Sequence, residues 1–516
     1  MNSSIKSSIK NINNITFHTK KCTDLTEPEI KMCSDLFSQN YGEWGKDDPE
    51  KRKGKKISLG VKYYKDNMLK ADHYVSLAYY DEKIIGQAFY IRKKFENEEC
   101  MSWVLQLVVS YGYRKIGIGK RLLYSIWGFS GDEAWGLATS NPYTVKTLES
   151  ATFREVCPKV IRDNLDKVKK IGKEVPYINS YNVNLYNSVV DTEFYIDSSD
   201  TKNKIKNAYG HNWKLGELPP GNEWLAFTFK NQGLRKFSTD EFEMWIQYSE
   251  SKLKEAYARM NTENQAWAKS TNREKEVDFI IKELNLSRNE KIADFGCGIG
   301  RHCIEFLNKG FNNIIGIDFV SSNIEKAKES VSTDKKSIFS EKDCRKVDLG
   351  FSYDVILCLY DVIGSFPDNK ENEKILSNIY KHLSPNGYAV ISVMNMELTL
   401  AKAKYVEDII NNPKSLLNLK PSKIMQKSGD IFNPEYYIID KESKLVYRKE
   451  QFDDDGDLSA EHVIRDKRYT KDEICKMAKN IGFHVKDVRF VSAGKWQKKL
   501  NNTDPKAKEI LLILQK

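Results

Sequence analysis

The chain has 516 residues, of which 40% are hydrophobic and 30% charged, and its formal net charge is +10 at pH 7. This length predicts two to four domains. The composition is typical of a globular protein, and no stretch approaches the ~18 apolar residues that a membrane span needs. The positive surplus is spread among many acids, so a solvated surface explains it better than a nucleic-acid-binding face.

Residues 1–22 form a polar stretch in which the isoleucines are isolated. We expect a loosely attached tail here, because the stretch lacks the apolar core of a signal peptide. Beyond it, apolar spacing and strand-like composition predict two helices, the two strands of a hairpin and a third strand. These elements are expected at residues 27–37, 57–69, 73–80, 84–91 and 102–109.

The nine cysteines are scattered along the chain, and no C-x-x-C pair occurs among them. This pattern argues against a zinc cluster and against a disulfide framework, and it is typical of proteins in a reducing cytosol. We therefore expect a cytoplasmic protein without a metal site.

The third strand runs into a glycine-containing loop, Arg114-Lys-Ile-Gly117-Ile-Gly119, and an amphipathic helix begins at once. The backbone amides of residues 114–120 would point at an anion, supported by the helix dipole and by flanking positive charge. Such a loop suits a pyrophosphate. A strand at residues 134–139 and a helix that opens at Asn141-Pro142 follow.

This loop and the order of the elements around it resemble GNAT-type acyl-CoA-dependent N-acetyltransferases. The resemblance implies a mixed α/β fold for this half of the chain and acetyl-CoA as its cofactor. The residues to which it gives a role in cofactor binding are Leu107, Val109, Arg114, Lys115, Ile116, Gly117, Ile118, Gly119, Lys120 and Asn141. The alternative is a capped helix after a strand, with glycines that serve only the turn.

The chemistry of this half is less complete than its cofactor loop. That family often keeps a glutamate on the strand before the loop and a tyrosine in the later helix. Here the strand carries Trp103 and Gln106 but no acid, and Tyr143 is the candidate tyrosine although it comes early in its helix. A binding module without acetyl transfer therefore stays open.

A helix at residues 158–170 and strands at residues 188–196 and 224–229 are expected to complete the first domain. The joint follows, because a charged helical pattern resumes at Thr239. The predicted organisation is a tail, a first domain, a linker and a second domain, at residues 1–22, 23–232, 233–240 and 241–516.

The second half is organised around Lys291-Ile-Ala-Asp294 and the glycine run that follows it, Gly296, Gly298 and Gly300. A buried strand, a glycine turn and a helix N-terminus make a nucleotide-type pocket, in which glycines let the backbone approach a ligand. A second apolar strand ends at Asp318, eighteen residues after Gly300, where a carboxylate can accept both hydroxyls of a ribose. The G-x-G-x-G spacing weakens a dinucleotide interpretation.

This stretch resembles motif I and the ribose acid of class I S-adenosylmethionine-dependent methyltransferases. The resemblance covers roughly residues 240–516 and implies S-adenosylmethionine as the methyl donor. The residues to which it gives a role in donor binding are Asp294, Gly296, Cys297, Gly298, Gly300, Asp318, Phe319, Asp343, Cys344 and Leu359. Asp343 and Cys344 come where this fold hydrogen-bonds the adenine amino group. Met260 and Trp267 lie where a helix closes over donor and acceptor, or packs on the sheet.

Strands and helices alternate after Asp318, which predicts a parallel, doubly wound sheet with right-handed crossovers. An insertion at about residues 400–468 carries antiparallel strands and resembles the acceptor lid of small-molecule members of the family. The fold class is therefore α/β. A GNAT-like mixed domain precedes a Rossmann-like methyltransferase domain with an antiparallel lid.

The loop after the fourth strand of the second domain, from Tyr360 to Phe366, is where the transferred methyl group should emerge. It has neither the [D/N]PP[Y/F] sequence nor the Pro-Cys pair of DNA methyltransferases, which argues against a DNA substrate. Tyr360 and Asp361 are candidate catalytic residues, with a helix cap or a buried hydrogen-bonded pair as the alternative. His462 is a further candidate in the lid, although a lone histidine is usually structural.

These observations favour a cytosolic bifunctional enzyme that joins an acetyl-CoA-dependent N-acetyltransferase to an S-adenosylmethionine-dependent methyltransferase. The expected acceptor is a small amine-bearing metabolite or a peptide. Two alternatives stay open: a methyltransferase with a non-catalytic binding module, and an enzyme that modifies RNA or protein.

Overall fold

The structure is a computed structural model, and it describes residues 12–96, 99–178, 183–184, 188–258, 269–422, 430–451 and 461–516. The chain divides into two compact units. Unit 1 comprises residues 1–238 and 455–461, and unit 2 comprises residues 239–454 and 462–516. The boundary between Ser238 and Thr239 falls inside the segment that the sequence predicts as a linker.

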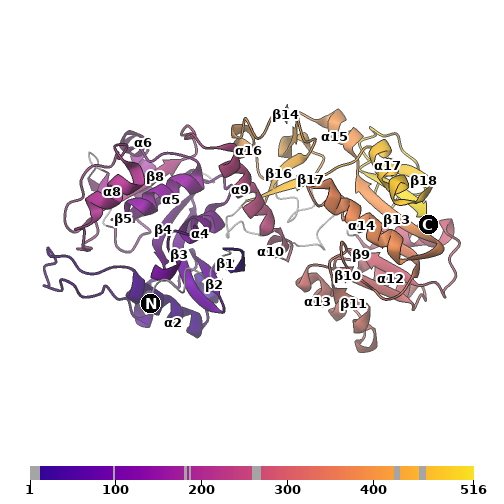
Figure 1. The fold of residues 1–516 in the computed structure, drawn as a ribbon, viewed down its shortest axis with the longest axis horizontal. Coiled ribbons are helices and arrows are strands. Elements are labelled where there is room, and N and C mark those ends of the chain that lie inside the picture. Colours follow the sequence, from indigo (N-terminus) through magenta and orange to yellow (C-terminus); the bar gives the residue numbers. More distant parts are fainter. Residues whose placement is uncertain are drawn as a thin grey trace. The chain divides into compact units, whose positions relative to one another are not determined.

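Unit 1 is a mixed sheet with the strand order β1-β2-β3-β4-β5-β8-β7-β6, surrounded by helices (Figure 1). Its helices are α2 (Glu27–Asn40), α3 (Val61–Asn67), α4 (Ile118–Trp127), α5 (Pro142–Thr152), α6 (Pro158–Asp163), α7 (Leu165–Gly172) and α8 (Thr201–Tyr209). Its strands are β1 (Thr16–Lys21), β2 (His73–Tyr80), β3 (Lys83–Lys94), β4 (Cys100–Val109), β5 (Ala134–Thr139), β6 (Val183–Asn184), β7 (Val189–Asp191) and β8 (Asn222–Phe229).

The strands β4 and β5 are the parallel pair of this sheet, and they part at their carboxyl ends. They pair only from Met101 with Ala134 to Val104 with Leu137. Beyond that point β4 continues along β3, and β5 continues along β8. Leu105 is skipped in the register between β3 and β4, so a bulge lies at the place where the strands part.

Three sequence predictions for unit 1 differ from the structure. The predicted tail is wrong for residues 16–21, which form β1 against β2; only Phe17 of this strand is buried, so its pattern is weak. The predicted helix at residues 158–170 is two helices, because Asn164 has φ −117° and ψ 24°. The predicted strand at residues 188–196 is reduced to β7.

Unit 2 contains a seven-stranded sheet with the order β11-β10-β9-β12-β13-β19-β18, in which only the pairs with β19 are antiparallel. Its strands are β9 (Ile292–Phe295), β10 (Ile314–Asp318), β11 (Phe339–Glu341), β12 (Tyr353–Cys358), β13 (Leu383–Met394), β18 (His484–Val491) and β19 (Glu509–Gln515). The helices are α9 (Thr239–Ser251), α10 (Leu253–Ala258), α11 (Ser270–Glu283), α12 (Arg301–Asn308), α13 (Ser321–Glu329), α14 (Asn369–His382), α15 (Met396–Lys402), α16 (Lys414–Asn418) and α17 (Lys471–Ile481).

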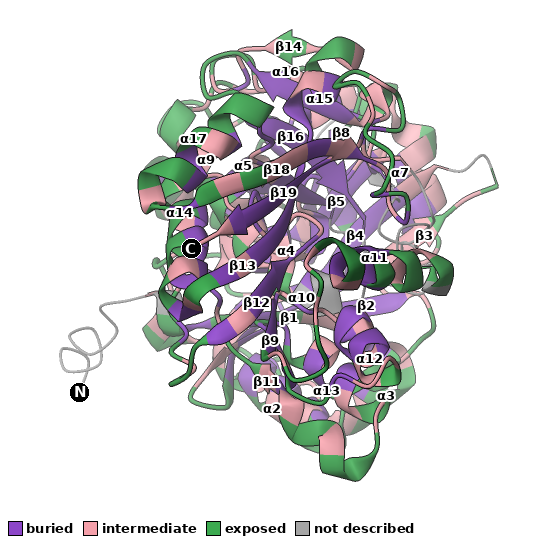
Figure 2. Cartoon of the chain, turned by 90° about the vertical axis from the view of Figure 1, so that its right-hand side faces the viewer, coloured by how far each residue is buried: buried purple, intermediate pink, exposed green. Residues whose placement is uncertain are grey.

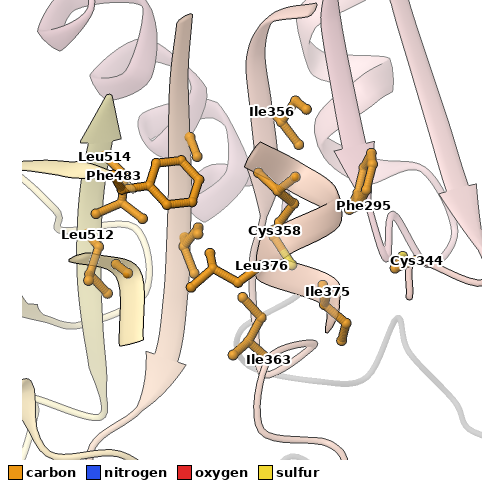
Figure 3. Packing of buried hydrophobic residues seen from close by; sticks show 14 of the residues in the cluster. Phe295, Cys344, Ile356, Cys358, Ile363, Ile375, Leu376, Phe483, Leu512 and Leu514 are labelled. Carbon is orange, nitrogen blue, oxygen red and sulfur yellow. The ribbon is translucent and has the colours of Figure 1, made fainter. Parts of the chain in front are cut away.

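Both faces of this sheet are buried, as the alternation of side chains along a strand requires. Ile356 and Cys358 of β12 pack with Leu376 of α14 on one face (Figure 3), while Val355 and Leu357 pack beneath α11, α12 and α13 on the other. Figure 2 shows the strands mostly buried and the outer faces of the helices exposed. Because β9, β10 and β12 run parallel, their carboxyl ends meet at one edge of the sheet.

The insertion forms a separate four-stranded sheet with the order β14-β15-β16-β17. Its strands are β14 (Val406–Glu407), β15 (Tyr437–Asp440), β16 (Val446–Glu450) and β17 (His462–Asp466). The pairs β15–β16 and β16–β17 are antiparallel. Among the described residues, no helix is long and apolar enough to cross a bilayer.

Candidate functional site

The glycine run after β9 adopts a backbone that only glycine takes without strain. Gly296, Gly298 and Gly300 have φ values of 80°, 55° and 76°. A Cβ at Gly296 would lie 2.3 Å from Val362 Cγ2, and one at Gly300 would lie 2.7 Å from the ring of Phe339. At Gly298 a Cβ would meet nothing within 4 Å. The outer glycines thus allow close packing within the protein, whereas the middle one faces open space that a ligand can enter.

Two carboxylates border this loop at the carboxyl ends of adjacent strands. Asp318 ends β10, where its Oδ2 accepts the Gly298 amide at 3.0 Å and its Oδ1 accepts the Val320 amide at 2.8 Å. The Asn323 side chain also hydrogen-bonds to this carboxylate, which leaves one lone pair for a ligand hydroxyl. Asp294 is buried at the end of β9, and this burial raises its pKa to about 6, against the opposing charges of His302 and Arg301.

The other residues predicted to bind the donor lie around the same edge. The Phe319 side chain is 47% exposed directly after Asp318, whereas Cys297, Cys344 and Leu359 are buried. Asp343 accepts the backbone amide of Arg345 as well as Nε and Nη2 of its guanidinium, so its predicted contact with an adenine amino group would compete with Arg345. That contact stays a prediction. Met260 and Trp267 lie outside the described residues.

Tyr360 and Asp361 follow β12 in an unusual conformation, with φ values of 56° and 75°. The Tyr360 hydroxyl donates to Glu276 Oε1 at 2.5 Å, and the Tyr360 amide donates to Ser392 Oγ at 2.8 Å. The phenol and the backbone of Tyr360 are therefore both held in place, and its strained conformation has contacts that maintain it.

Glu276 of α11 is the centre of this arrangement, and the sequence did not point to it. Its fully buried carboxylate also accepts the Gly494 amide at 2.6 Å and lies 3.0 Å from Nε2 of the buried His302. Burial opposes ionisation of Glu276, but these hydrogen bonds outweigh it and lower its pKa. In the sequence, Glu276 could have been noticed as an acid next to Val277, on the apolar face of the helix.

Glu509 is a second residue that sequence reasoning missed. It begins β19 opposite Met394 of β13, which places it at the same edge of the sheet. Ser392 hydrogen-bonds to it, but its Oε2 has no hydrogen-bond partner among the described residues. Burial and the nearby charge of Glu276 raise the pKa of Glu509 to about 8. In the sequence, Glu509 could have been noticed as an acid directly before the apolar run 510–514.

Asp361 is influenced by a network of buried charges in and next to the lid sheet. Arg448 of β16 donates through Nε to Asp466 Oδ2 at 2.7 Å and through Nη1 to Glu450. Burial raises the pKa of Asp361 well above its usual range; Asp466 and Glu509 add to this, and Arg448 and Arg468 oppose it. Asp361 Oδ1 has no hydrogen-bond partner among the described residues.

His462 lies at the other end of β17 from Asp466, a separation of about 13 Å at the usual rise of a strand. It faces Glu450 across the strand pair. Arg465 of the same strand forms ion pairs with Glu243 and Glu250 of α9. The structure thus brings Tyr360 and Asp361 together and places His462 apart from them.

In unit 1, the predicted cofactor loop lies between the end of β4 and α4. Gly117 precedes the helix with a φ of 92°, and the amides of Ile118, Gly119 and Lys120 lie in its first turn, where no intrahelical acceptor exists. The Arg114 guanidinium is engaged within unit 1: Nε donates to Val109 O at 2.9 Å, and Nη2 donates to Asn40 O. This guanidinium fixes the loop to β4 and α2.

The remaining predicted residues of unit 1 lie near this loop or open a helix. Leu107 and Val109 belong to the part of β4 that has left β5, and Lys115 and Ile116 form the turn, where Ile116 is 39% exposed. The Asn141 side chain caps α5 by accepting the Tyr143 amide at 3.1 Å, and Tyr143 itself is 39% exposed. A cofactor role for these residues stays a prediction.

Comparisons with known proteins concern unit 2. A family model described as a methyltransferase domain matches residues 268–488. A ubiquinone biosynthesis O-methyltransferase of Rickettsia canadensis is 30% identical over 169 residues, which cover 30% of this chain and 68% of that protein. The chain belongs to the S-adenosylmethionine-dependent methyltransferase family. The chain is also 31% identical over 121 residues to a phosphoethanolamine N-methyltransferase of Plasmodium falciparum, covering 22% of this chain and 42% of that protein.

Among solved structures, the chain is similar to an S-adenosylmethionine-dependent methyltransferase from Clostridium acetobutylicum. The identity is 16%, the TM-score is 0.33, and the match covers 47% of this chain and 90% of that one. Across these curated relatives, the chain spans 42% to 68% of their length. Apart from residues 455–461, which belong to unit 1, the family model lies in unit 2, and these comparisons give no support to an acetyltransferase in unit 1.

Proposed function

We propose that the chain transfers a methyl group from S-adenosylmethionine to a small amine-bearing metabolite or peptide, and that unit 1 is a binding module. The observation that carries the donor half is the open space at Gly298 between the carboxylates of Asp294 and Asp318. When bound, the donor supplies a methyl group already activated on a sulfonium, so the protein has mainly to position the acceptor.

The residues at the sheet edge fit a nucleoside-bearing donor. Asp318 presents its carboxylate where a ribose diol would bind, with Asn323 as the donor that a ribose hydroxyl would displace, and the exposed ring of Phe319 next to it offers a face for a base. Gly298 lets the backbone approach without a side chain in between. Asp294 and Asp318 add negative charge, which favours a cationic donor.

The acceptor half of the proposal rests on Asp361 and Glu509. Each has a carboxylate oxygen without a partner among the described residues, beside a tyrosine whose hydroxyl already donates to Glu276. Two free carboxylate oxygens favour an acceptor that enters as an ammonium ion over a phenol or an acid. A carboxylate with a raised pKa is also suited to take the proton that the ammonium must lose before its nitrogen attacks.

Calorimetric titration with S-adenosylhomocysteine tests the donor site, with Gly298→Asp as the site variant. Mass spectrometry of a panel of primary amines, phenols and carboxylic acids incubated with enzyme and donor tests the acceptor class. We expect methylated amines. Methylated phenols without methylated amines would refute the acceptor class while leaving methyl transfer intact.

Unit 1 as an acetyltransferase is the second candidate. Its supporting observation is the parting of β4 and β5 next to the first turn of α4, where an acyl-CoA pantetheine arm and pyrophosphate would fit. Titration of the whole protein with acetyl-CoA tests it, with Gly117→Asp as the variant. Binding that Gly117→Asp abolishes, followed by turnover of the thioester, would establish it. Absence of binding would leave unit 1 as a module for another ligand.

A further inference from the structure

Two successive residues of the loop after β12 adopt a conformation that is rare for residues other than glycine. Tyr360 and Asp361 begin this loop, residues 360–364, which we call the acceptor loop, and their φ values of 56° and 75° lie in the left-handed region. This region is costly for a residue that carries a Cβ, so the conformation persists only where other contacts hold it. The Ser392 hydroxyl, which accepts the Tyr360 amide, is one of these contacts. The phenol of Tyr360 provides another.

The two ends of the acceptor loop are anchored to different helices. At the carboxyl end, the Gly364 amide donates to Asn372 Oδ1 of α14 at 3.0 Å. At the amino end, the Tyr360 hydroxyl donates to Glu276 Oε1 of α11 at 2.5 Å. Asp361 comes directly after the amino-terminal anchor, and its Oδ1 has no hydrogen-bond partner in the part of the chain that the structure describes. The direction of its carboxylate therefore depends on how Tyr360 is held.

Glu276 also holds the helix that follows the glycine run of the proposed donor site. Its Oε2 lies 3.0 Å from Nε2 of His302, the second residue of α12, and α12 begins directly after Gly300. The Tyr360 ring lies against the same helix, with its centroid 5.9 Å from that of the His302 ring and 5.6 Å from Cζ of Arg301. One carboxylate and one ring therefore connect the acceptor loop with the donor side of the site.

The helix that carries Glu276 is itself fixed by the end of β18 and the residues that follow it. Four side chains of α11, spaced by four, three and four residues, lie on one face of the helix, and each contacts the segment 489–496. These contacts are Asn272 with Gly494, Glu276 with the Gly494 amide, Phe279 with Trp496 and Glu283 with Arg489. The position of the Glu276 carboxylate is therefore set independently of the acceptor loop, which makes it a fixed point for that loop and for α12.

We propose that Glu276 is a positioning residue that couples the two sides of the site, so that a bound donor stabilises the strained conformation of the acceptor loop. This proposal rests on donor binding at Gly298 as proposed above. The loop has two states, a left-handed one with the Tyr360 hydroxyl on Glu276 and a relaxed one without that bond. A bound donor keeps α12 and His302 in place against Glu276, which favours the first state. Asp361 is then held toward the acceptor only while the donor is present.

The test is hydrogen–deuterium exchange of the full chain, read by mass spectrometry of the peptide that spans the acceptor loop, with S-adenosylhomocysteine as the probe. In the wild type, we expect the ligand to slow exchange of this peptide at least tenfold. Tyr360→Phe removes only the hydroxyl that reaches Glu276. It should speed exchange of the loop in the ligand-free protein at least tenfold and reduce the protective effect of the ligand to less than threefold. Tyr388→Phe, at a half-buried tyrosine of β13, is the matched control and should behave like the wild type.

Equal protection of the acceptor loop by the ligand in the wild type and in Tyr360→Phe would overturn the proposal, because the protection would then come from direct contact and not through Glu276. Equal exchange of the loop in the two ligand-free proteins would overturn it as well, and that comparison needs no donor binding. Calorimetry should show that Tyr360→Phe binds S-adenosylhomocysteine within threefold of the wild type, so that lost protection reports lost coupling. A wild type that does not bind S-adenosylhomocysteine would instead refute the proposed donor site. Peptides of β13 should exchange alike in all three proteins, which shows that the effect is local.

Discussion

Replacement of Gly298 by aspartate should separate donor binding from folding. With φ at 55°, a side chain at position 298 costs about 1 kcal/mol, since a left-handed conformation costs roughly 1–2 kcal/mol and aspartate tolerates it better than most residues. A steric clash does not add to this conformational cost, because a Cβ at position 298 meets nothing within 4 Å. The new carboxylate would instead occupy the space that the donor needs. We expect at least a 100-fold loss of S-adenosylhomocysteine affinity, about 2.8 kcal/mol.

The matched comparison is Gly296→Ala, where the added Cβ would lie 2.3 Å from Val362 Cγ2. Overpacking of this kind typically costs about 1–3 kcal/mol, and the φ of 80° adds about 1–2 kcal/mol. Urea denaturation should therefore show a larger loss of stability for Gly296→Ala than for Gly298→Asp, whereas calorimetry should show the loss of binding in Gly298→Asp. A folded Gly298→Asp protein that binds S-adenosylhomocysteine within threefold of the wild type would refute the assignment of the donor site.

Three further changes probe the acceptor side. Glu276→Gln leaves a single acceptor oxygen for the Tyr360 hydroxyl and the Gly494 amide. It should lower the free energy of unfolding, measured by urea denaturation, by about 3 kcal/mol. The control Glu274→Gln, at an exposed position, should change that free energy by less than about 0.5 kcal/mol. Asp361→Asn keeps the size of the side chain and one of its oxygens, and it should lower the yield of methylated amine at least tenfold by mass spectrometry; an unchanged yield would exclude Asp361 from the acceptor site. The folded-state pKa of Glu509, about 8, is above its unfolded value, so wild-type stability should fall as pH rises from about 5 to about 8. The stability of the Glu509→Gln protein should fall less over that pH range. Parallel curves of stability against pH for the two proteins would contradict the raised pKa of Glu509.

The proposed donor side of the site could be predicted from the sequence because its residues are local in the chain. Asp294, the three glycines and Asp318 lie within 25 consecutive residues, and a parallel strand, a turn and the next strand bring them together wherever this pattern folds. The order of helices and strands in unit 2 followed in the same way from alternating apolar runs. Residues 16–21 escaped notice because an edge strand with a single buried side chain leaves little pattern.

The proposed acceptor side could not be predicted from the sequence because its residues come together only in the fold. Glu276 meets Tyr360 across 84 residues and the Gly494 amide across 218. Glu509 joins them because β19 runs antiparallel beside β13, which no local pattern specifies. The Arg114 side chain shows the same limit, because its guanidinium donates to the carbonyls of Val109 and Asn40, and Asn40 lies 74 residues away in the chain.

The position of β19 between β13 and β18 has a consequence for biosynthesis. β13 and β18 are both synthesised before residues 509–515, yet in the finished sheet each of them pairs with β19. A ribosome-bound chain that has reached residue 500 therefore holds two strands with unpaired edges and no way to join them. Nascent unit 2 should depend on chaperones for this interval, and a stop codon just before residue 509 should yield a chain that proteases remove.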